Sequence, residues 1–76
     1  MSLHIDTRRK IKAIPDIKGF DDLLNKSTLT EEDKIILRLH YLQGKDFRYI
    51  GDILGYAEVT IKKRHARSLS KLNKLF

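Results

Sequence analysis

Six cationic side chains crowd into the last eighteen residues, and of all the side chains in the sequence they are best suited to bind a partner. Residues 59–76 contain no Asp or Glu, whereas residues 1–28 have a net charge of +2 and residues 29–58 one of −2. The whole net charge of +6 therefore equals that of this segment. Such one-sided positive charge is typical of nucleic-acid binding, with an anionic membrane surface as the competing partner. The cations are Lys62, Lys63, Arg64, Arg67, Lys71 and Lys74.

Residue types that can serve catalysis or metal binding are present in the sequence, but they do not have the spacing that such sites need. His4, His40 and His65 do not form a metal-ligand pattern, and the chain has no Cys to complete one or to act as a nucleophile. The acidic groups Asp21–Asp22 and Glu31–Asp33 are explained as helix-capping acids. The sequence therefore predicts a protein that is not an enzyme and that uses no cofactor or metal.

The apolar runs are short. The longest, Ile35–Leu37, has three residues, whereas a membrane-spanning helix needs about 20. The basic final segment lacks Trp, and its inward face would include His65 and Ser68, so binding to a membrane surface is the weaker interpretation. Because the chain has no Cys, it suits a reducing compartment, and we expect it in the cytoplasm.

The first element that positions the basic segment is a helix that begins after Thr30. Three acids follow this N-cap candidate, where the helix dipole favours negative charge. Apolar residues then recur at helical spacing on two adjoining faces as far as Leu42, and Gly44 is the predicted C-terminal cap. The two faces are Ile36, Leu37 and Tyr41, and Ile35, Leu39 and Leu42.

Two further helices are expected, separated by a tight turn at Gly55. Asp46 is the predicted N-cap of a short helix over Phe47–Leu54, and Gly51 in its middle indicates that another helix crosses closely there. The last helix is predicted from about Glu58 to Lys74. Its inward stripe would be Ile61, His65, Ser68, Leu69, Leu72 and Phe76. Two helices joined in this way, the second strongly basic, indicate a helix-turn-helix whose second helix lies in the DNA major groove.

The N-terminal residues 1–28 carry weaker signals. Arg8–Ile14 is expected to form a helical turn or two before Pro15, followed by a short helix at Asp21–Asn25. This segment would cover the face of Ile35, Leu39 and Leu42, and the available apolar residues are Ile14, Ile17, Phe20, Leu23 and Leu24. We predict an all-α fold: a tri-helical helix-turn-helix core at 29–76, with one or two short N-terminal helices packed on it in a single domain.

Residues 29–72, LTEEDKIILRLHYLQGKDFRYIGDILGYAEVTIKKRHARSLSKL, resemble region 4 of bacterial sigma factors. The resemblance rests on the opening Leu29, the run Ile36–Leu39, Tyr41, Gly44, the pair Ile50–Gly51, Leu54–Gly55, Thr60–Lys62, Arg64, Arg67 and Leu72. Regulator domains of the LuxR/GerE type share a similar opening and a similar recognition helix, and they are the related alternative. Either resemblance implies an interaction with duplex DNA in transcription.

The sigma resemblance implies that Arg64, Arg67 and Lys71 hold DNA phosphates. It also implies a set of residues that face base edges: Glu58, Val59, Thr60, Lys62 and Lys63. Helical geometry places several of these opposite Ile61 and His65, which agrees with that division. Arg48 and Tyr49, in the first turn of the middle helix, are further phosphate candidates, because helix N-termini and Tyr hydroxyls commonly contact the backbone.

Two residues depart from the sigma pattern. Ala57 stands where the family has a capping Ser or Thr, and His65 stands where it has an apolar residue, as a partner-facing side chain or a buried imidazole. A whole sigma factor needs a further domain for core polymerase, which 76 residues cannot hold, so we do not expect a complete sigma factor.

The interpretation that fits best is a sequence-specific DNA-binding protein of bacterial or phage transcription regulation. RNA polymerase and a second copy of the chain are the expected additional partners, contacted through an apolar C-terminal strip of Leu69, Leu72, Leu75 and Phe76. Two alternatives remain at this stage. One is a protein-interaction module that docks on RNA polymerase or another factor, and the other is a phage DNA-packaging or replication protein with the same fold.

Overall fold

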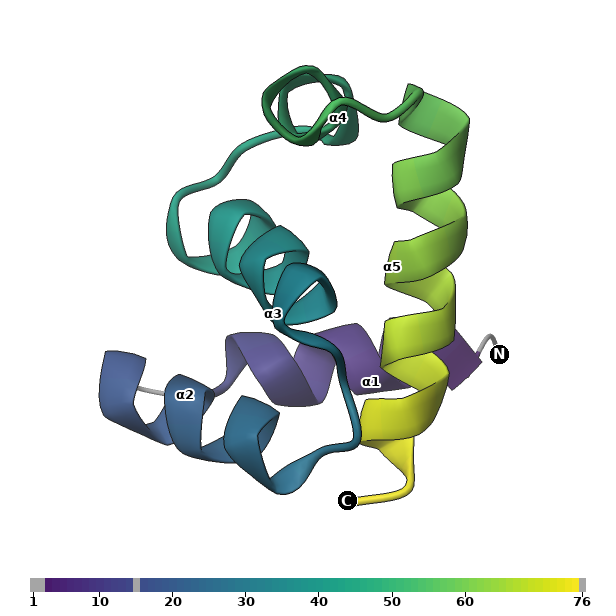
Figure 1. The fold of residues 1–76 in the computed structure, drawn as a ribbon. Helices are drawn as coiled ribbons and strands as arrows, with labels where there is room; N and C mark the ends of the chain where they lie inside the picture. Colours follow the sequence, from purple (N-terminus) through teal and green to yellow (C-terminus); the bar gives the residue numbers. More distant parts are fainter. Residues whose placement is uncertain (1–2, 15, 76) are drawn as a thin grey trace.

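The computed structural model describes residues 3–14 and 16–75, and these residues form α-helices with no strand. In Figure 1, α5 stands upright along one side of the molecule, with α4 beside its upper end and α1 and α2 lower down. The predicted all-α helix-turn-helix fold is confirmed. The elements are α1 (Leu3–Lys12), α2 (Ile17–Lys26), α3 (Glu31–Leu37) continued by the π-helical turn η1 (Arg38–Leu42), α4 (Phe47–Leu54) and α5 (Glu58–Asn73).

The start of α3 and the end of η1 follow from their caps. Thr30 Oγ1 accepts a hydrogen bond from the Asp33 backbone N–H at 3.2 Å, as expected of an N-cap. Gly44, at φ +68°, ends the element, and the Lys45 N–H donates to the Leu39 carbonyl at 3.0 Å. This bond spans one residue more than the usual Schellman closure because the π-helical turn holds an extra residue. The sequence analysis did not predict that turn.

The helix-turn-helix itself lies where the sequence predicts it. Asp46 Oδ1 accepts a hydrogen bond from the Tyr49 N–H at 2.8 Å, and Gly55, at φ +82°, donates its N–H to the Gly51 carbonyl. A Cβ on Gly51 would lie 2.5 Å from the carbonyl oxygen of Tyr56. Glycine is therefore required at position 51, because the turn passes directly against α4.

Two groups of buried residues hold the helices together. We call the smaller one, Ile36, Ile50 and Ile61, the minor core; it joins α3, α4 and the first half of α5. The larger one joins α1, α2, α3 and the second half of α5, and we call it the main core. The main core consists of Ile11, Phe20, Leu24, Leu29, Leu37, Leu69 and Leu72.

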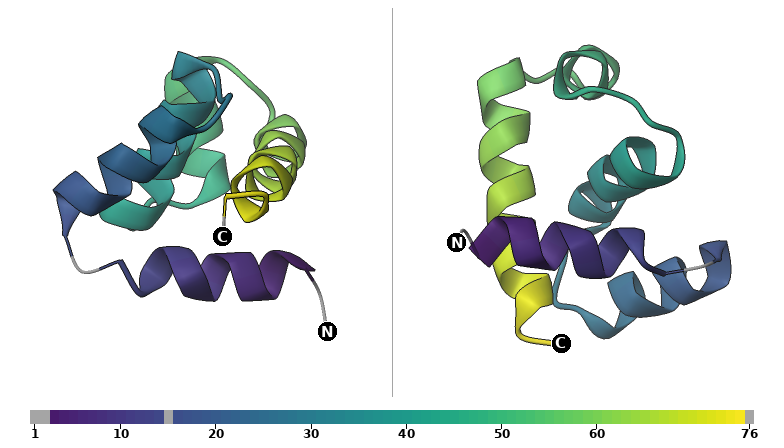
Figure 2. Two further views of the ribbon diagram at one scale, coloured as in Figure 1. Left: turned by 90° about the horizontal axis from the view of Figure 1, so that it is seen from below. Right: turned by 180° about the vertical axis from the view of Figure 1, so that it is seen from behind.

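The N-terminal segment is more helical than predicted. Helix α1 begins before Arg8, and α2 extends beyond Asp21–Asn25 at both ends. Asp16 caps its N-terminal end, accepting a hydrogen bond from the Gly19 N–H at 2.6 Å, and the Ser27 N–H closes its C-terminal end on the Leu24 carbonyl. Helix α1 crosses the C-terminal half of α5 (Figure 2), where the Thr7 hydroxyl donates to Asn73 Oδ1 at 3.0 Å. The predicted packing of this segment on the tri-helical core is confirmed.

The face that this segment covers differs from our prediction, which was wrong. Ile35 and Leu42 remain 40% and 39% exposed, and Ile17, one of the residues expected to cover them, is 64% exposed. Helices α1 and α2 pack instead on the side of Leu37 and Tyr41. That side already adjoins the apolar face of α5, so covering it buries a continuous main core. Leu39, the third member of the predicted face, packs against the minor core instead.

The apolar C-terminal strip is also mostly internal. Leu69 and Leu72 are buried in the main core and cannot contact a partner. Leu75 is 45% exposed, and Phe76 lies outside the described residues. The strip therefore offers only one described side chain for a second copy of the chain.

Candidate nucleic-acid interface

Helix α5 buries one face and exposes the opposite one. The predicted inward stripe is confirmed for its described members, while Phe76 lies outside the described residues. The buried side chains are Ile61, His65, Ser68, Leu69 and Leu72. The cations of the basic segment consequently lie on the other sides of the helix.

The first turns of α5 carry the candidates for contact with base edges. Glu58, Val59, Lys62 and Lys63 are exposed, and Thr60 is half-buried. Lys62 Nζ lies 3.6 Å from Glu58 Oε1, so these two side chains form a pair across one helical turn. An exposed pair of this kind is worth little, and both groups can exchange it for another partner.

A cationic cleft of about 390 Å³ lies between the start of α3 and one edge of α5. Lys63, Arg67 and Lys71 follow one another at four-residue intervals and so lie on the same side of the helix. None of the three makes an ion pair with another described residue. The cleft is lined by Thr30, Asp33, Thr60, Lys63, Arg64, Arg67 and Lys71. Such an arrangement can neutralise a phosphate group.

Arg64 differs from its cationic neighbours because two acids of α3 already hold it. Its Nε donates to Asp33 Oδ1 at 2.9 Å, and its Nη1 donates to Glu32 Oε1. The Arg64 side chain is only 21% exposed, and that of Asp33 is 10% exposed. The Tyr56 hydroxyl donates to the same Glu32 oxygen at 2.7 Å, which extends the network to the turn.

The charges of this network stabilise one another. The hydrogen bond from Arg64, followed by that from Tyr56, lowers the pKa of Glu32 below its ordinary value. The hydrogen bond to Glu32 raises the pKa of Arg64, and it also raises that of Tyr56. At neutral pH the carboxylate and the guanidinium are therefore both ionised, and the tyrosine keeps its proton.

The two candidates on α4 lie apart from the cleft. Arg48 and Tyr49 are exposed in the first turn of α4, and Lys45 Nζ lies 4.9 Å from the centre of the Tyr49 ring. This turn therefore presents two cations and a phenol at a helix N-terminus, where the helix dipole also favours an anion. The Lys45–Tyr49 contact was not predicted from the sequence, because it depends on the bend of the chain after Gly44.

His65 is a buried imidazole, which decides between the two alternatives left open by the sequence. Its Nε2 lies 2.8 Å from the Tyr41 hydroxyl, and its ring centre is 5.2 Å from that of His40 and 4.8 Å from that of Phe47. The side chain is 7% exposed. It therefore joins α5 to η1 and α4 instead of facing a partner.

From the sequence, Glu32 and Asp33 were predicted to serve helix capping alone, and no ionic role was predicted for Tyr56. The cap is present, but the same two carboxylates also bind Arg64. The acid–arginine pairs span 31 and 32 residues, and no local pattern marks such a contact. Only a tertiary arrangement that brings α3 beside α5 makes it visible.

Among the residues described, no group of three or more His, Cys, Asp or Glu side chains is arranged to hold a metal ion. None of the described helices is long and apolar enough to cross a membrane.

Comparison with known protein families places this geometry in a family. The family model for sigma-70, region 4, matches residues 27–74, which is more than half of the chain. No curated protein and no solved structure shows a significant match. The matched range contains α3, the helix-turn-helix of α4 and α5, and the cationic cleft. With its all-α fold and a basic helix presented by a tight turn, the chain belongs to the sigma-70 region 4 family of DNA-binding helix-turn-helix domains that act in transcription.

Proposed function

We propose that this domain binds duplex DNA in a sequence-specific way, with α5 in the major groove, and regulates transcription in bacteria or phage. The observation that carries the proposal is the arrangement of charges on α5. Lys63, Arg67 and Lys71 form a cationic edge beside the exposed first turns of the helix, and they make no ion pair with residues 3–14 or 16–75. An edge that neutralises phosphates next to side chains that reach base edges is the combination that major-groove recognition needs.

Base recognition is assigned to the exposed first turns. A lysine can donate to the guanine acceptors, a glutamate can accept from cytosine N4, and a valine or threonine methyl can contact the thymine methyl. On this basis Glu58, Val59, Thr60, Lys62 and Lys63 face the bases. Thr60 and Lys63 also line the cleft, so they lie at the border between base and backbone contacts.

Backbone binding is assigned to two separate places. Arg67 and Lys71 bind a phosphate in the cleft, and Arg48 and Tyr49 bind one at the N-terminus of α4. Arg64 is set apart from the phosphate ligands, because its guanidinium is already bonded to two carboxylates. In this proposal residues 29–76 are the DNA-binding unit and residues 1–28 support it through α1 and α2.

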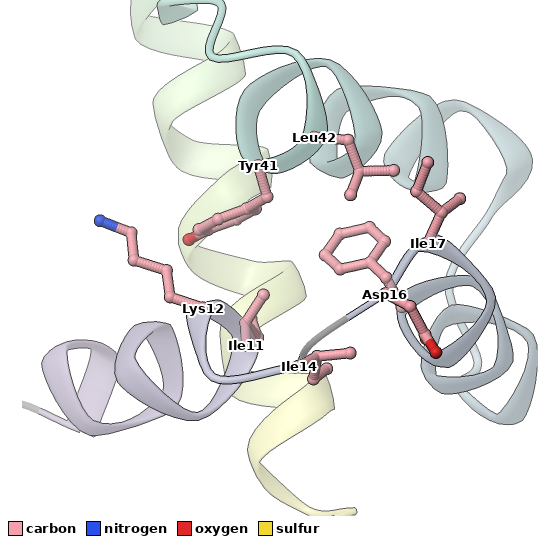
Figure 3. A pocket seen from close by; sticks show the side chains of 8 residues that line it. Ile11, Lys12, Ile14, Asp16, Ile17, Tyr41 and Leu42 are labelled. Atoms are coloured by element: carbon pink, nitrogen blue, oxygen red, sulfur yellow. The ribbon is translucent and has the colours of Figure 1, made fainter.

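RNA polymerase is the additional partner that we propose, and an exposed apolar rim favours it. Leu42 and Ile17 face each other across a second cleft, of about 230 Å³, between η1 and the start of α2 (Figure 3). Ile17 and Leu42 are both exposed, and Ile11, Ile14 and Tyr41 extend the apolar lining. Large exposed apolar groups gathered in one place mark a protein contact. The surface would serve the same purpose if the domain were mainly an interaction module.

The salt dependence of DNA binding tests the proposal. For about three neutralised phosphates, as the cations Arg48, Arg67 and Lys71 provide, the slope of log K against log salt concentration should be about −3 on duplex DNA. Arg67→Ala and Lys71→Ala should each reduce its magnitude by about 0.9 in a fluorescence anisotropy titration. Lys18→Ala, at an exposed lysine of α2 that lies outside the basic segment, is the control and should leave it unchanged.

If the Arg67 and Lys71 variants bind DNA as the wild type does while polymerase binding is retained, the domain is an interaction module and the proposal fails. If a duplex of selected sequence and one of scrambled sequence bind equally well, the proposal of sequence-specific recognition fails even though DNA is bound.

A further inference from the structure

The sides of α5 differ in how firmly its cations are held. Lys63, Arg67 and Lys71 make no ion pair within the described part of the chain, whereas Arg64, in the middle of them, is joined to α3 and to the turn. Its guanidinium bonds Asp33 and Glu32, and its carbon Cζ lies 5.4 Å from the centre of the Tyr56 ring. One side chain thus connects three segments of the helix-turn-helix.

The first half of α5 needs such a connection. Ala57 stands at its N-cap and makes no side-chain hydrogen bond, so the usual local anchor is missing. The apolar support beneath this half is the minor core, in which Leu39, Phe47 and Leu54 pack half-buried around the three buried isoleucines. The angle at which α5 leaves the turn is therefore set by packing on this core and by polar contacts from other elements, without a side-chain cap at its first residue.

An arginine that bonds two carboxylates is well suited to set that angle. The guanidinium is planar, and its donors are fixed in direction, so bonds to two acids constrain orientation as well as distance. Tyr56 holds Glu32 from the other side through its hydroxyl. The network therefore ties the first turn of α3, the residue after Gly55 and the second turn of α5 together.

Releasing Arg64 to a DNA phosphate would be unfavourable. The Asp33 side chain is 10% exposed, and a largely buried carboxylate left without its cation loses more than an exposed one does. Lys63, one residue before Arg64, and Arg67, three residues after it, make no ion pair with a described acid. A phosphate entering the cleft therefore gains more from them than from Arg64.

We propose that Arg64, with Glu32, Asp33 and Tyr56, positions α5 for DNA recognition and does not itself contact DNA. The inference rests on the proposed function, since it assumes that α5 is the recognition helix. It deepens that function by dividing the cations of α5 into those that bind DNA and one that sets the angle of the helix.

The first test is the salt slope of Arg64→Gln and Arg64→Lys, measured on a selected and on a scrambled duplex. A positioning residue should leave the slope unchanged, while the ratio of selected to scrambled affinity should fall about tenfold, the effect of losing one hydrogen bond between charged groups. Arg64→Lys should lower this affinity ratio as well, because an ammonium group cannot make the two directed hydrogen bonds of the planar guanidinium. A slope whose magnitude falls by about 0.9 in Arg64→Gln, with normal binding by Arg64→Lys, would identify a phosphate contact and overturn the inference.

The acids give a test of opposite sign. Removing a negative charge near DNA should tighten binding if the carboxylate only repels phosphates. Glu32→Gln and Asp33→Asn should instead weaken binding to the selected duplex, because α5 loses its orientation, while binding to the scrambled duplex tightens. Glu31→Gln is the matched control: its side chain is 83% exposed and pairs with the neighbouring Lys34, so both duplexes should bind slightly more tightly. If Glu32→Gln behaves as Glu31→Gln does, the inference is wrong.

Tyr56→Phe removes the hydroxyl without any change of charge and keeps the ring, so it is the variant least able to unfold the domain. It should lower the ratio of the two affinities several-fold and speed amide hydrogen exchange at residues 58–61 in the free protein. Unchanged exchange and an unchanged ratio would overturn the inference. A wild-type protein that does not distinguish the two duplexes would overturn the proposed function, whereas the exchange measurement would still report on the network.

Discussion

The two halves of α5 rest on different kinds of support. The second half lies on the main core, where Leu69 and Leu72 meet apolar residues of α1, α2 and α3. The first half lies on the smaller minor core, with Leu39, Phe47 and Leu54 half-buried around it, and is also held by polar contacts through Arg64 and His65. The half that holds the fold together and the half proposed to read DNA are therefore separated along one helix.

This difference teaches how a small domain can combine stability with recognition. A chain of this size has little apolar surface to bury, so most of it serves one end of α5. At the other end of α5, hydrogen bonds and ion pairs supplement a smaller buried apolar surface, because they fix the orientation of the helix where apolar packing alone does not. Substitutions in the main core should consequently affect folding, and those near the turn should affect recognition.

The largest effect is expected from Leu72→Ala in the main core. Leu72 is fully buried, and truncating such a leucine costs about 2–5 kcal/mol. Because small domains have few kcal/mol to lose, this variant should be largely unfolded at room temperature. Urea denaturation followed by circular dichroism measures the change. A loss below about 1 kcal/mol would show that the main core is not the principal support.

Gly51→Ala should come next, and it acts at the turn. The added methyl would meet the Tyr56 carbonyl oxygen at 2.5 Å, and relieving this overlap should cost about 1–3 kcal/mol, which exceeds the gain of about 1 kcal/mol in helix propensity. DNA affinity should fall further than the loss of stability explains, because the turn that aims α5 must move. A variant that is more stable than the wild type would contradict the close approach.

Ala57→Ser should strengthen the weaker half. Residue 57 already has the extended backbone of an N-cap, with φ −67° and ψ 150°, and lacks only a side-chain acceptor. A serine there should raise the free energy of unfolding by about 1 kcal/mol, as measured by urea denaturation. If the free energy of unfolding does not rise and hydrogen exchange in the first turn of α5 is the same in both proteins, the network already fixes the start of the helix.

The smallest effect concerns acid. The folded-state pKa of Glu32 lies below its ordinary value of 4.5, so this carboxylate stabilises the fold above that pH and the contribution fades as the pH falls toward the folded pKa. Stability should therefore decline as the pH falls below the ordinary value of 4.5, and less steeply in Glu32→Gln than in the wild type. Parallel curves for the two proteins would show that the pair does not contribute. Denaturation midpoints at a series of pH values supply the comparison.

Much of the matched region could be predicted from sequence because its signals are local. Thr30, Asp46 and the two positive-φ glycines mark element ends, and each acts within a few residues. The bounds predicted for α4 agree with the structure, and α5 ends one residue earlier than predicted. Helices α1 and α2 are longer than predicted. The stretch before Arg8 shows no strong apolar periodicity, and Asp16 was not recognised as the N-cap of α2.

The features that escaped prediction depend on distant parts of the chain. The face of α3 that receives α1 and α2 is decided by where α5 places its leucines, and the partners of Arg64 come from residues more than thirty positions earlier. Arg64 was consequently grouped with the other cations of its helix. The base and phosphate roles of Lys62, Lys63, Arg67 and Lys71 stay predictions, since they concern a partner.

Selection of bound sequences from a random duplex pool is the measurement that tests recognition by α5 most directly. The wild type should enrich one short consensus, and Lys62→Ala and Lys63→Ala should relax it at individual base positions while Lys18→Ala leaves it intact. A palindromic consensus would indicate that two copies of the chain bind the site together. Failure of the wild type to enrich any sequence, or a consensus that both α5 variants leave unchanged, would contradict the account.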